Sequence, residues 1–155
     1  MKIFWKISAA GLAALFALSL SACGSSKEMN PADALAVMQT DIPFSEELTG
    51  LDKAAICKNY DLEETDLAGC AAAIGSGATA ENAAVLEGVD SAAAGRIQTA
   101  LRAFLDDWIE GYSDYKPEEV PKLEQAVLKV KGNYVILCIS ADSGKAAAVV
   151  KDILG

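Results

Sequence analysis

The stretch LEQAVLKVKGNYVILCIS (residues 123–140) decides the fold. Both of its halves are rich in valine, leucine and isoleucine, which favour β-strands. Gly132-Asn133 lies between them and is typical of a two-residue hairpin, because glycine accepts the positive φ of a type II′ turn without steric cost. Lysines at alternate positions of the first half predict one solvated face, whereas the second half is apolar throughout. We therefore expect a hairpin over residues 124–140 whose second strand lies inside a sheet.

Helical patterns precede and follow this hairpin. Apolar side chains recur at helical spacing from Ser91 to about Ser113, opposite a charged face, which predicts a long amphipathic helix with its aromatic residues in the core. Start signals predict three shorter helices, at about residues 31–38, 52–60 and 143–154, the last capped by Asp142 or Ser143. The side chains expected to face inward from this last helix are Ala146, Val149, Val150 and Ile153. Pro117 and Pro121 bound an expected loop.

The N-terminus is organised like a secretory signal. Two lysines precede residues 7–20, which are uncharged, mostly apolar and too few to span a bilayer. Leu20-Ser21-Ala22-Cys23 then resembles the lipobox of bacterial lipoproteins. The resemblance implies that diacylglycerol is attached to the Cys23 thiol and that cleavage falls between Ala22 and Cys23. An ordinary signal peptidase would meet the bulky Leu20 three residues before that cut, although a cut after Gly24 would suit it.

The lipobox predicts the organisation of the whole chain. Residues 1–22 are expected to be a removed signal peptide, residues 23–30 a lipid anchor and tether, and residues 31–155 a single domain. Each buried CH₂ of the lipid contributes about 0.8 kcal/mol, and stable anchoring needs more than one acyl chain. The membrane is therefore an expected partner, and the expected location is the outer face of the cytoplasmic membrane.

The composition restricts the chemistry of the expected mature chain. Removing residues 1–22 takes away two lysines and no acids, so the net charge becomes (13 − 2) − 22 = −11. An acidic surface repels phosphate backbones, which argues against nucleic acid as a partner. The chain contains no histidine, which excludes Ser-His-Asp, Cys-His and HExxH sites.

Three cysteines follow Cys23, and this odd number leaves at least one thiol unpaired or pairs it between chains. Cys138 lies in the apolar half of the hairpin and is predicted to be a buried small hydrophobe. Cys57 and Cys70 either form a disulfide across a short loop or remain two buried thiols. The sequence leaves both alternatives open.

A second resemblance covers residues 31–155. It rests on segments 41–52, 60–62, 80–86, 115–119 and 131–135. These resemble a family of small lipoproteins from Gram-positive bacteria that is known only as a domain of unknown function (four-three-five-eight). The family has two acids where this chain has Glu81-Asn82, which puts the role of the second acid in doubt. The resemblance implies no catalytic residue, and it favours a strand pair at residues 70–77 and 82–88, where propensities alone leave helix and strand open.

These expectations combine into one α+β domain. Two antiparallel strand pairs flank the long helix, and the last helix follows the second pair. We therefore predict two layers, in which a four-stranded, mainly antiparallel sheet carries its helices on one face. The strand order is not predicted.

Several groups of residues are candidate sites, and each has a simpler structural explanation. The acids of segment 61–66 lack the glycine and closing glutamate of a calcium loop and favour a solvated loop; they are Asp61, Glu63, Glu64 and Asp66. Paired carboxylates such as those of glycosidases occur on the long helix, where charges are routine on a polar face; they are Asp106, Asp107 and Glu110. Ser143-Gly144-Lys145 predicts a helix cap, because it lacks the glycine loop of a phosphate site. Gly75-Ser76-Gly77 predicts a turn.

No residue set therefore predicts catalysis, a metal site or a cofactor other than the diacylglycerol on Cys23. A lysine acts as a base only if it is buried with a lowered pKa, and four lysines are expected to be exposed instead: Lys116, Lys122, Lys129 and Lys131. We expect a non-enzymatic module of the cell envelope that binds an envelope protein or a small ligand. The alternative is a thiol-redox or other enzymatic accessory that uses Cys57 and Cys70. The binding subunit of a transporter is disfavoured, because such proteins usually need two domains around a cleft.

Overall fold

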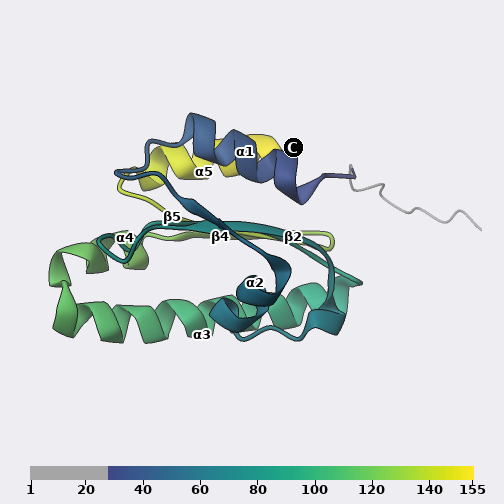
Figure 1. Ribbon diagram of the computed structural model, residues 1–155. Helices are drawn as coiled ribbons and strands as arrows, with labels where there is room; N and C mark the ends of the chain where they lie inside the picture. The colour runs from purple at the N-terminus through teal and green to yellow at the C-terminus, as the bar shows by residue number, and fades with distance from the viewer. Residues whose placement is uncertain (1–27) are drawn as a thin grey trace, which may run out of the picture.

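The computed structural model describes residues 28–155 and places an antiparallel sheet between two layers of helices (Figure 1). The strands are β1 (Thr49–Leu51), β2 (Leu67–Ile74), β3 (Asn82–Gly88), β4 (Val127–Lys131) and β5 (Tyr134–Ile139). They are arranged in the order β1-β2-β3-β5-β4, and every neighbouring pair is antiparallel. The predicted α+β class is therefore confirmed.

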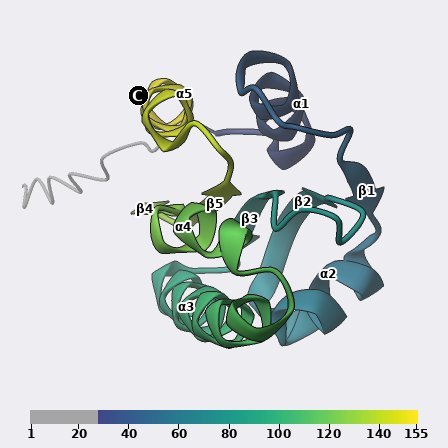
Figure 2. The ribbon, with the colours of Figure 1, turned by 90° about the vertical axis from the view of Figure 1, so that its left-hand side faces the viewer.

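The helices divide between the two faces of the sheet, as Figure 2 shows. One face carries α1 (Pro31–Asp41) and α5 (Ser143–Leu154). The other face carries α2 (Lys53–Tyr60), α3 (Ser91–Tyr115) and α4 (Val120–Glu124). Two short 3₁₀ turns, η1 (Glu64–Asp66) and η2 (Pro117–Glu119), precede β2 and α4.

The predicted two-layer arrangement with four strands is wrong, because helices cover both faces and β1 adds a fifth strand. The reason lies in the central strands. All six residues of β5 are buried, and β3 sends Ala83 and Val85 into one hydrophobic cluster and Ala84 and Leu86 into another. A strand that is apolar on both faces requires cover on both faces. The predicted position of β5 inside the sheet is confirmed.

The two clusters form separate cores on either side of the sheet. Met38 of α1 and Val150 of α5 belong to the first cluster, and both are fully buried. Ile97 and Leu101 of α3 belong to the second and are equally buried. Burying one such side chain stabilises the fold by roughly 1.5–3 kcal/mol. The inward positions predicted for α5 are also confirmed, with Ile153 only partly buried.

Several local predictions hold, and others shift. The hairpin turns at Gly132-Asn133, where Lys131 pairs with Tyr134 and Gly132 has φ 59°. Among residues 28–155, Asp61 is the one non-glycine residue with positive φ. Asn133 therefore has negative φ and Gly132 positive φ, which fits a type II′ turn.

The strand predicted at 70–77 lies at 67–74 instead. Residues 117–124 form η2 and α4 rather than a loop and the start of a strand, because both prolines occupy first-turn positions, where their missing N–H costs nothing.

The helix starts are capped by side chains, as their sequences predict. Asn30 accepts a 2.9 Å hydrogen bond from the N–H of Ala32, and Asp52 accepts one of 2.8 Å from the N–H of Ala55. Asp142, rather than Ser143, caps α5.

Residues 28–155 contain no helix that is both long and apolar enough to cross a bilayer. Cys23, the predicted signal peptide and the first part of the predicted tether lie outside the described residues.

Candidate functional site

A pocket of about 220 Å³ lies between the C-terminal end of α2 and the middle of α3. We call it the α2–α3 pocket. Three of its side chains are aromatic and two are carboxylates, and none is basic. Its lining residues are Asn59, Tyr60, Asp61, Ala100, Ala103, Phe104, Asp107 and Trp108.

The end of α2 brings three consecutive residues to this pocket. Tyr60, the last helical residue, is 1% exposed and anchors the helix in the second core. Asp61 follows in the left-handed region, with φ 52° and ψ 53°, which aspartate tolerates better than most residues. The N–H groups of Asp61 and Leu62 then both bond to the carbonyl of Cys57. This closure of the helix holds Asn59 and Asp61 beside the buried tyrosine.

An aromatic ladder runs along α3 from the pocket to the surface. The ring of Tyr60 meets Phe104 edge-on at a centroid distance of 4.9 Å, and Phe104 meets Trp108 at 4.5 Å. Trp108 in turn lies 5.6 Å from Tyr112. Spacing of four residues stacks the α3 rings on one side of the helix. The prediction that the α3 aromatics form core is confirmed for Phe104, whereas Trp108 and Tyr112 are only partly buried.

The polar groups of the pocket differ in their partners. The Tyr60 hydroxyl donates a 2.6 Å hydrogen bond to Oδ1 of Asn82 on β3. The Nδ2 of Asn59 is buried and has no hydrogen-bond partner. Asp61 and Asp107 are exposed, and neither takes part in an ion pair among residues 28–155. The pocket therefore combines an aromatic surface with two carboxylates that form no ion pair within residues 28–155.

A second polar group, the buried ionic cluster, lies where β3 begins and consists of Glu81, Glu119 and Lys122. Glu81 is fully buried, and its carboxylate accepts hydrogen bonds of 2.7 and 2.9 Å from the N–H and hydroxyl of Ser45. Nζ of Lys122 lies 2.9 Å from Glu119 and 3.8 Å from Glu81. Burial acts to raise the pKa of Glu119, but hydrogen bonds from Ala80 and Lys122 outweigh it, so that the pKa is lowered.

The cluster has no free ligand-binding group. Nζ of Lys122 lies within 4 Å of both carboxylates, and each carboxylate also accepts a hydrogen bond from the backbone, as buried charges require. It joins the segment after α1, the β2–β3 loop and α4, so its role is structural. The prediction that Lys122 is exposed is wrong, because its side chain retains only 17% exposure between the two glutamates.

Residues 40–140 match the protein family described as "Domain of unknown function (DUF4358)". The chain belongs to this family. The match covers more than half of the chain, and it contains the whole α2–α3 pocket and the buried ionic cluster. The assignment made from the sequence is confirmed at this level. No curated protein and no solved structure matches the chain.

The three cysteines of the family domain are free thiols in the structure. Burial raises the pKa of Cys57 and of Cys70, and it raises the pKa of Cys138 to about 12. A raised pKa lowers the thiolate fraction at neutral pH, which weighs against the thiol-redox alternative. The disulfide between Cys57 and Cys70 stays a prediction. Cys138 is buried, as predicted.

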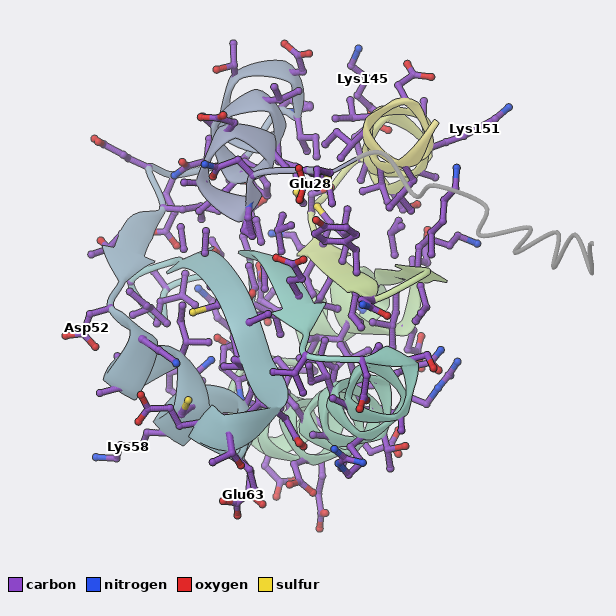
Figure 3. The ribbon with its side chains drawn as sticks, turned by 90° about the vertical axis from the view of Figure 1, so that its right-hand side faces the viewer. Glu28, Asp52, Lys58, Glu63, Lys145 and Lys151 are labelled. Carbon is purple, nitrogen blue, oxygen red and sulfur yellow. The ribbon has the colours of Figure 1, made fainter. Side chains whose placement is uncertain are left out.

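The acidic side chains of segment 61–66 have different partners. Asp66 forms a two-pronged ion pair with Arg96 of α3, at 2.6 and 2.8 Å. Glu64 lies 3.3 Å from Lys53. Figure 3 shows Glu63 and Lys58 both pointing outward, on the side of the sheet opposite Lys145 and Lys151 of α5. Within residues 28–155, no three histidine, cysteine, aspartate or glutamate side chains gather as metal ligands.

The remaining candidates lie where their patterns predicted. Asp106, Asp107 and Glu110 are all exposed on α3. Gly75-Ser76-Gly77 belongs to the loop between β2 and β3, and Ser143-Gly144-Lys145 is the first turn of α5. Sequence reasoning missed Asn59, Glu81 and Glu119 as structural polar residues. One signal was present, since Glu81-Asn82 interrupts an alanine-rich apolar run.

Proposed function

We propose that this protein is a lipid-anchored, non-enzymatic binding module of the cell envelope. It is held on the outer face of the cytoplasmic membrane through diacylglycerol on Cys23, and it binds its ligand in the α2–α3 pocket. The observation that carries the binding role is the pocket itself, which joins an aromatic floor to free carboxylates. Binding sites are typically concave and largely apolar, with a few polar groups that orient the ligand.

The chemistry of the pocket supports binding rather than turnover. Its lining contains no serine, threonine, cysteine, lysine or histidine that could act as a nucleophile or a nitrogen base. Its two carboxylates are exposed to water. A carboxylic acid that donates protons in catalysis is usually held in an apolar environment. Exposed carboxylates suit the attraction and orientation of a ligand.

The position of the pocket supports presentation away from the membrane. The described chain begins on the α1–α5 layer, where the N–H of Met29 bonds to the Tyr134 hydroxyl at 3.1 Å. The helices that line the α2–α3 pocket lie on the other side of the sheet (Figure 1). With a lipid on Cys23, residues 23–30 would span at most about 28 Å. This tether would hold the α1–α5 layer toward the membrane and leave the pocket facing outward.

The anchor is tested by mass spectrometry of the protein purified from membranes. The expected N-terminal peptide begins at Cys23 and carries diacylglycerol. An unmodified Cys23 in the wild-type protein would contradict the anchor. Release of Cys23→Ser into the medium is not required, because an uncleaved signal would still hold the chain.

The binding role is tested by photo-crosslinking in cells. A benzoylphenylalanine is placed at Ala103, an exposed α3 position that lines the pocket, and in a second protein at Ala92, an exposed position on the same helix outside it. Irradiation should give a discrete adduct, seen as a defined mass increase on the α3 peptide, from position 103 and not from position 92. The same adducts from both positions, or none from 103, would contradict the proposal.

A further inference from the structure

We propose that the group bound by the α2–α3 pocket is a lysine or arginine side chain of a peptide segment. This inference rests on the proposed binding function and names the chemical class of its ligand. It follows from the charge, the aromatic surface and the volume of the pocket.

The charge of the pocket selects a cation. Asp61 reaches it from the end of α2 and Asp107 from α3, and no basic side chain lines it. Three cations on this side of the sheet are paired elsewhere: Arg96 with Asp66, Lys53 with Glu64 and Lys122 with Glu119. Lys58 of α2 is exposed and does not line the pocket. Arg102 lines a different pocket, between α3 and α4. Two carboxylates without a counter-charge beside a hollow attract a positive group from outside.

The aromatic surface favours an organic cation over a metal ion. Trp108 is only partly buried and forms one side of the pocket, and Phe104 lies at 4.5 Å from it. Ring faces attract ammonium and guanidinium groups, and tryptophan does so best. The methylene groups of a lysine or arginine would also cover apolar surface on Phe104. A hydrated metal ion gains neither contact, and no three ligating side chains of residues 28–155 meet to bind one.

The size of the pocket points to a single side chain of a larger ligand. The volume of about 220 Å³ is below the roughly 300–1,000 Å³ of sites that enclose a whole drug-sized molecule. It suits one long side chain, with the rest of the segment outside.

The test uses the protein purified in detergent from a Trp5→Phe variant, so that Trp108 is the one tryptophan whether or not residues 1–22 are removed, and hence a reporter in the pocket. The probes are the N-acetyl amides of lysine and arginine. The matched control is the N-acetyl amide of norleucine, which keeps the lysine carbon chain but lacks the ammonium group. Both cationic probes should change the fluorescence of Trp108 saturably, and norleucine should bind at least about tenfold more weakly.

Two variants of adjacent residues show whether the pocket is responsible. Asp107→Asn removes a carboxylate that lines the pocket, whereas Asp106→Asn makes the same change one residue away, outside its lining. The lysine probe should bind about fivefold more weakly to Asp107→Asn and nearly unchanged to Asp106→Asn.

The other outcomes would overturn the inference in distinguishable ways. Equal binding of norleucine and lysine would show that the pocket selects apolar groups. This result would contradict the cationic ligand but not the proposed binding function. Equal losses in Asp106→Asn and Asp107→Asn would show general attraction by an acidic surface, and would overturn the assigned site. No saturable change with any probe would overturn the cationic ligand, and the crosslinking at Ala103 would then decide the binding function separately.

Discussion

The hydroxyl of Tyr60 donates a 2.6 Å hydrogen bond to Oδ1 of Asn82, and both residues are buried. The bond connects α2, which supplies the end of the α2–α3 pocket, to the first residue of β3 in the sheet. Burial raises the pKa of the Tyr60 hydroxyl, so it remains protonated and remains the donor. The same residue carries the ring that meets Phe104, so one side chain fixes the pocket to both the sheet and α3.

Tyr60→Phe should destabilise the protein by about 1–3 kcal/mol. The change removes only the hydroxyl, and it leaves Oδ1 of Asn82 buried without its donor beside an Nδ2 that already has no partner. Urea denaturation measures the effect. Tyr115→Phe is the control, because Tyr115 is 74% exposed and should change stability by less than about 0.5 kcal/mol. Equal midpoints for the two variants would contradict the role of this bond.

Lys122→Met should cost about 3 kcal/mol, because it leaves Glu81 and Glu119 as neighbouring buried charges without a cation. Lys129→Met is the matched control, since Lys129 is exposed on β4. Thermal or urea unfolding compares the two. A loss no larger than that of the control would show that the buried ionic cluster does not depend on Lys122.

Glu46→Gln should reduce stability at neutral pH, and the reduction should disappear in acid. The carboxylate accepts hydrogen bonds from the Thr79 hydroxyl and the Ser76 N–H, which lower its pKa from 4.5 to about 2. A lowered folded-state pKa stabilises the fold above the unfolded value of 4.5, and this contribution is lost as the pH falls from 4.5 to about 2.

The measurement for this prediction is the difference in unfolding free energy between wild type and Glu46→Gln across that pH range. Glu47→Gln is the control, since Glu47 is exposed and accepts no side-chain hydrogen bond within residues 28–155. A difference that stays constant from neutral pH to pH 2, or an equal one for Glu47→Gln, would count against the assignment.

Gly132→Val should lower the free energy of unfolding by more than about 1 kcal/mol. Gly132 has φ 59°, a conformation that a β-branched residue adopts only under strain. Gly50→Val is the control, because a Cβ at Gly50 in β1 meets no atom within 4 Å and its φ is not positive. An unchanged denaturation midpoint for Gly132→Val would contradict the turn.

The local elements were predictable where residues within a short segment are enough to determine the structure of that segment. Asn30 and Asp52 cap helices because their side chains reach N–H groups two or three residues ahead. The turn at Gly132 depends on one backbone angle. The strand at 67–74 was misplaced, because alanine and glycine favour neither structure there and pairing with β3 decides the register.

The candidate site was less accessible to sequence reasoning. Asp107 was expected on an exposed helix face and lies on one, but its neighbour Asp61 comes from a loop far away in the chain. Lys122 has the sequence context of an exposed lysine, and only its position between Glu81 and Glu119 buries it. Each such relationship depends on which segments the sheet brings together.

The sequence by itself determined the family, the α+β class, the helix caps, the central hairpin and the absence of histidine chemistry, because these depend on residue types and on neighbours within a few positions. Only the tertiary structure decided the strand order, the second layer of helices, the pairing of Tyr60 with Asn82 and the placing of Asp61 and Asp107 around one pocket. The physical reason is that burial on both faces of a sheet, and contacts between distant segments, arise only when the chain is folded.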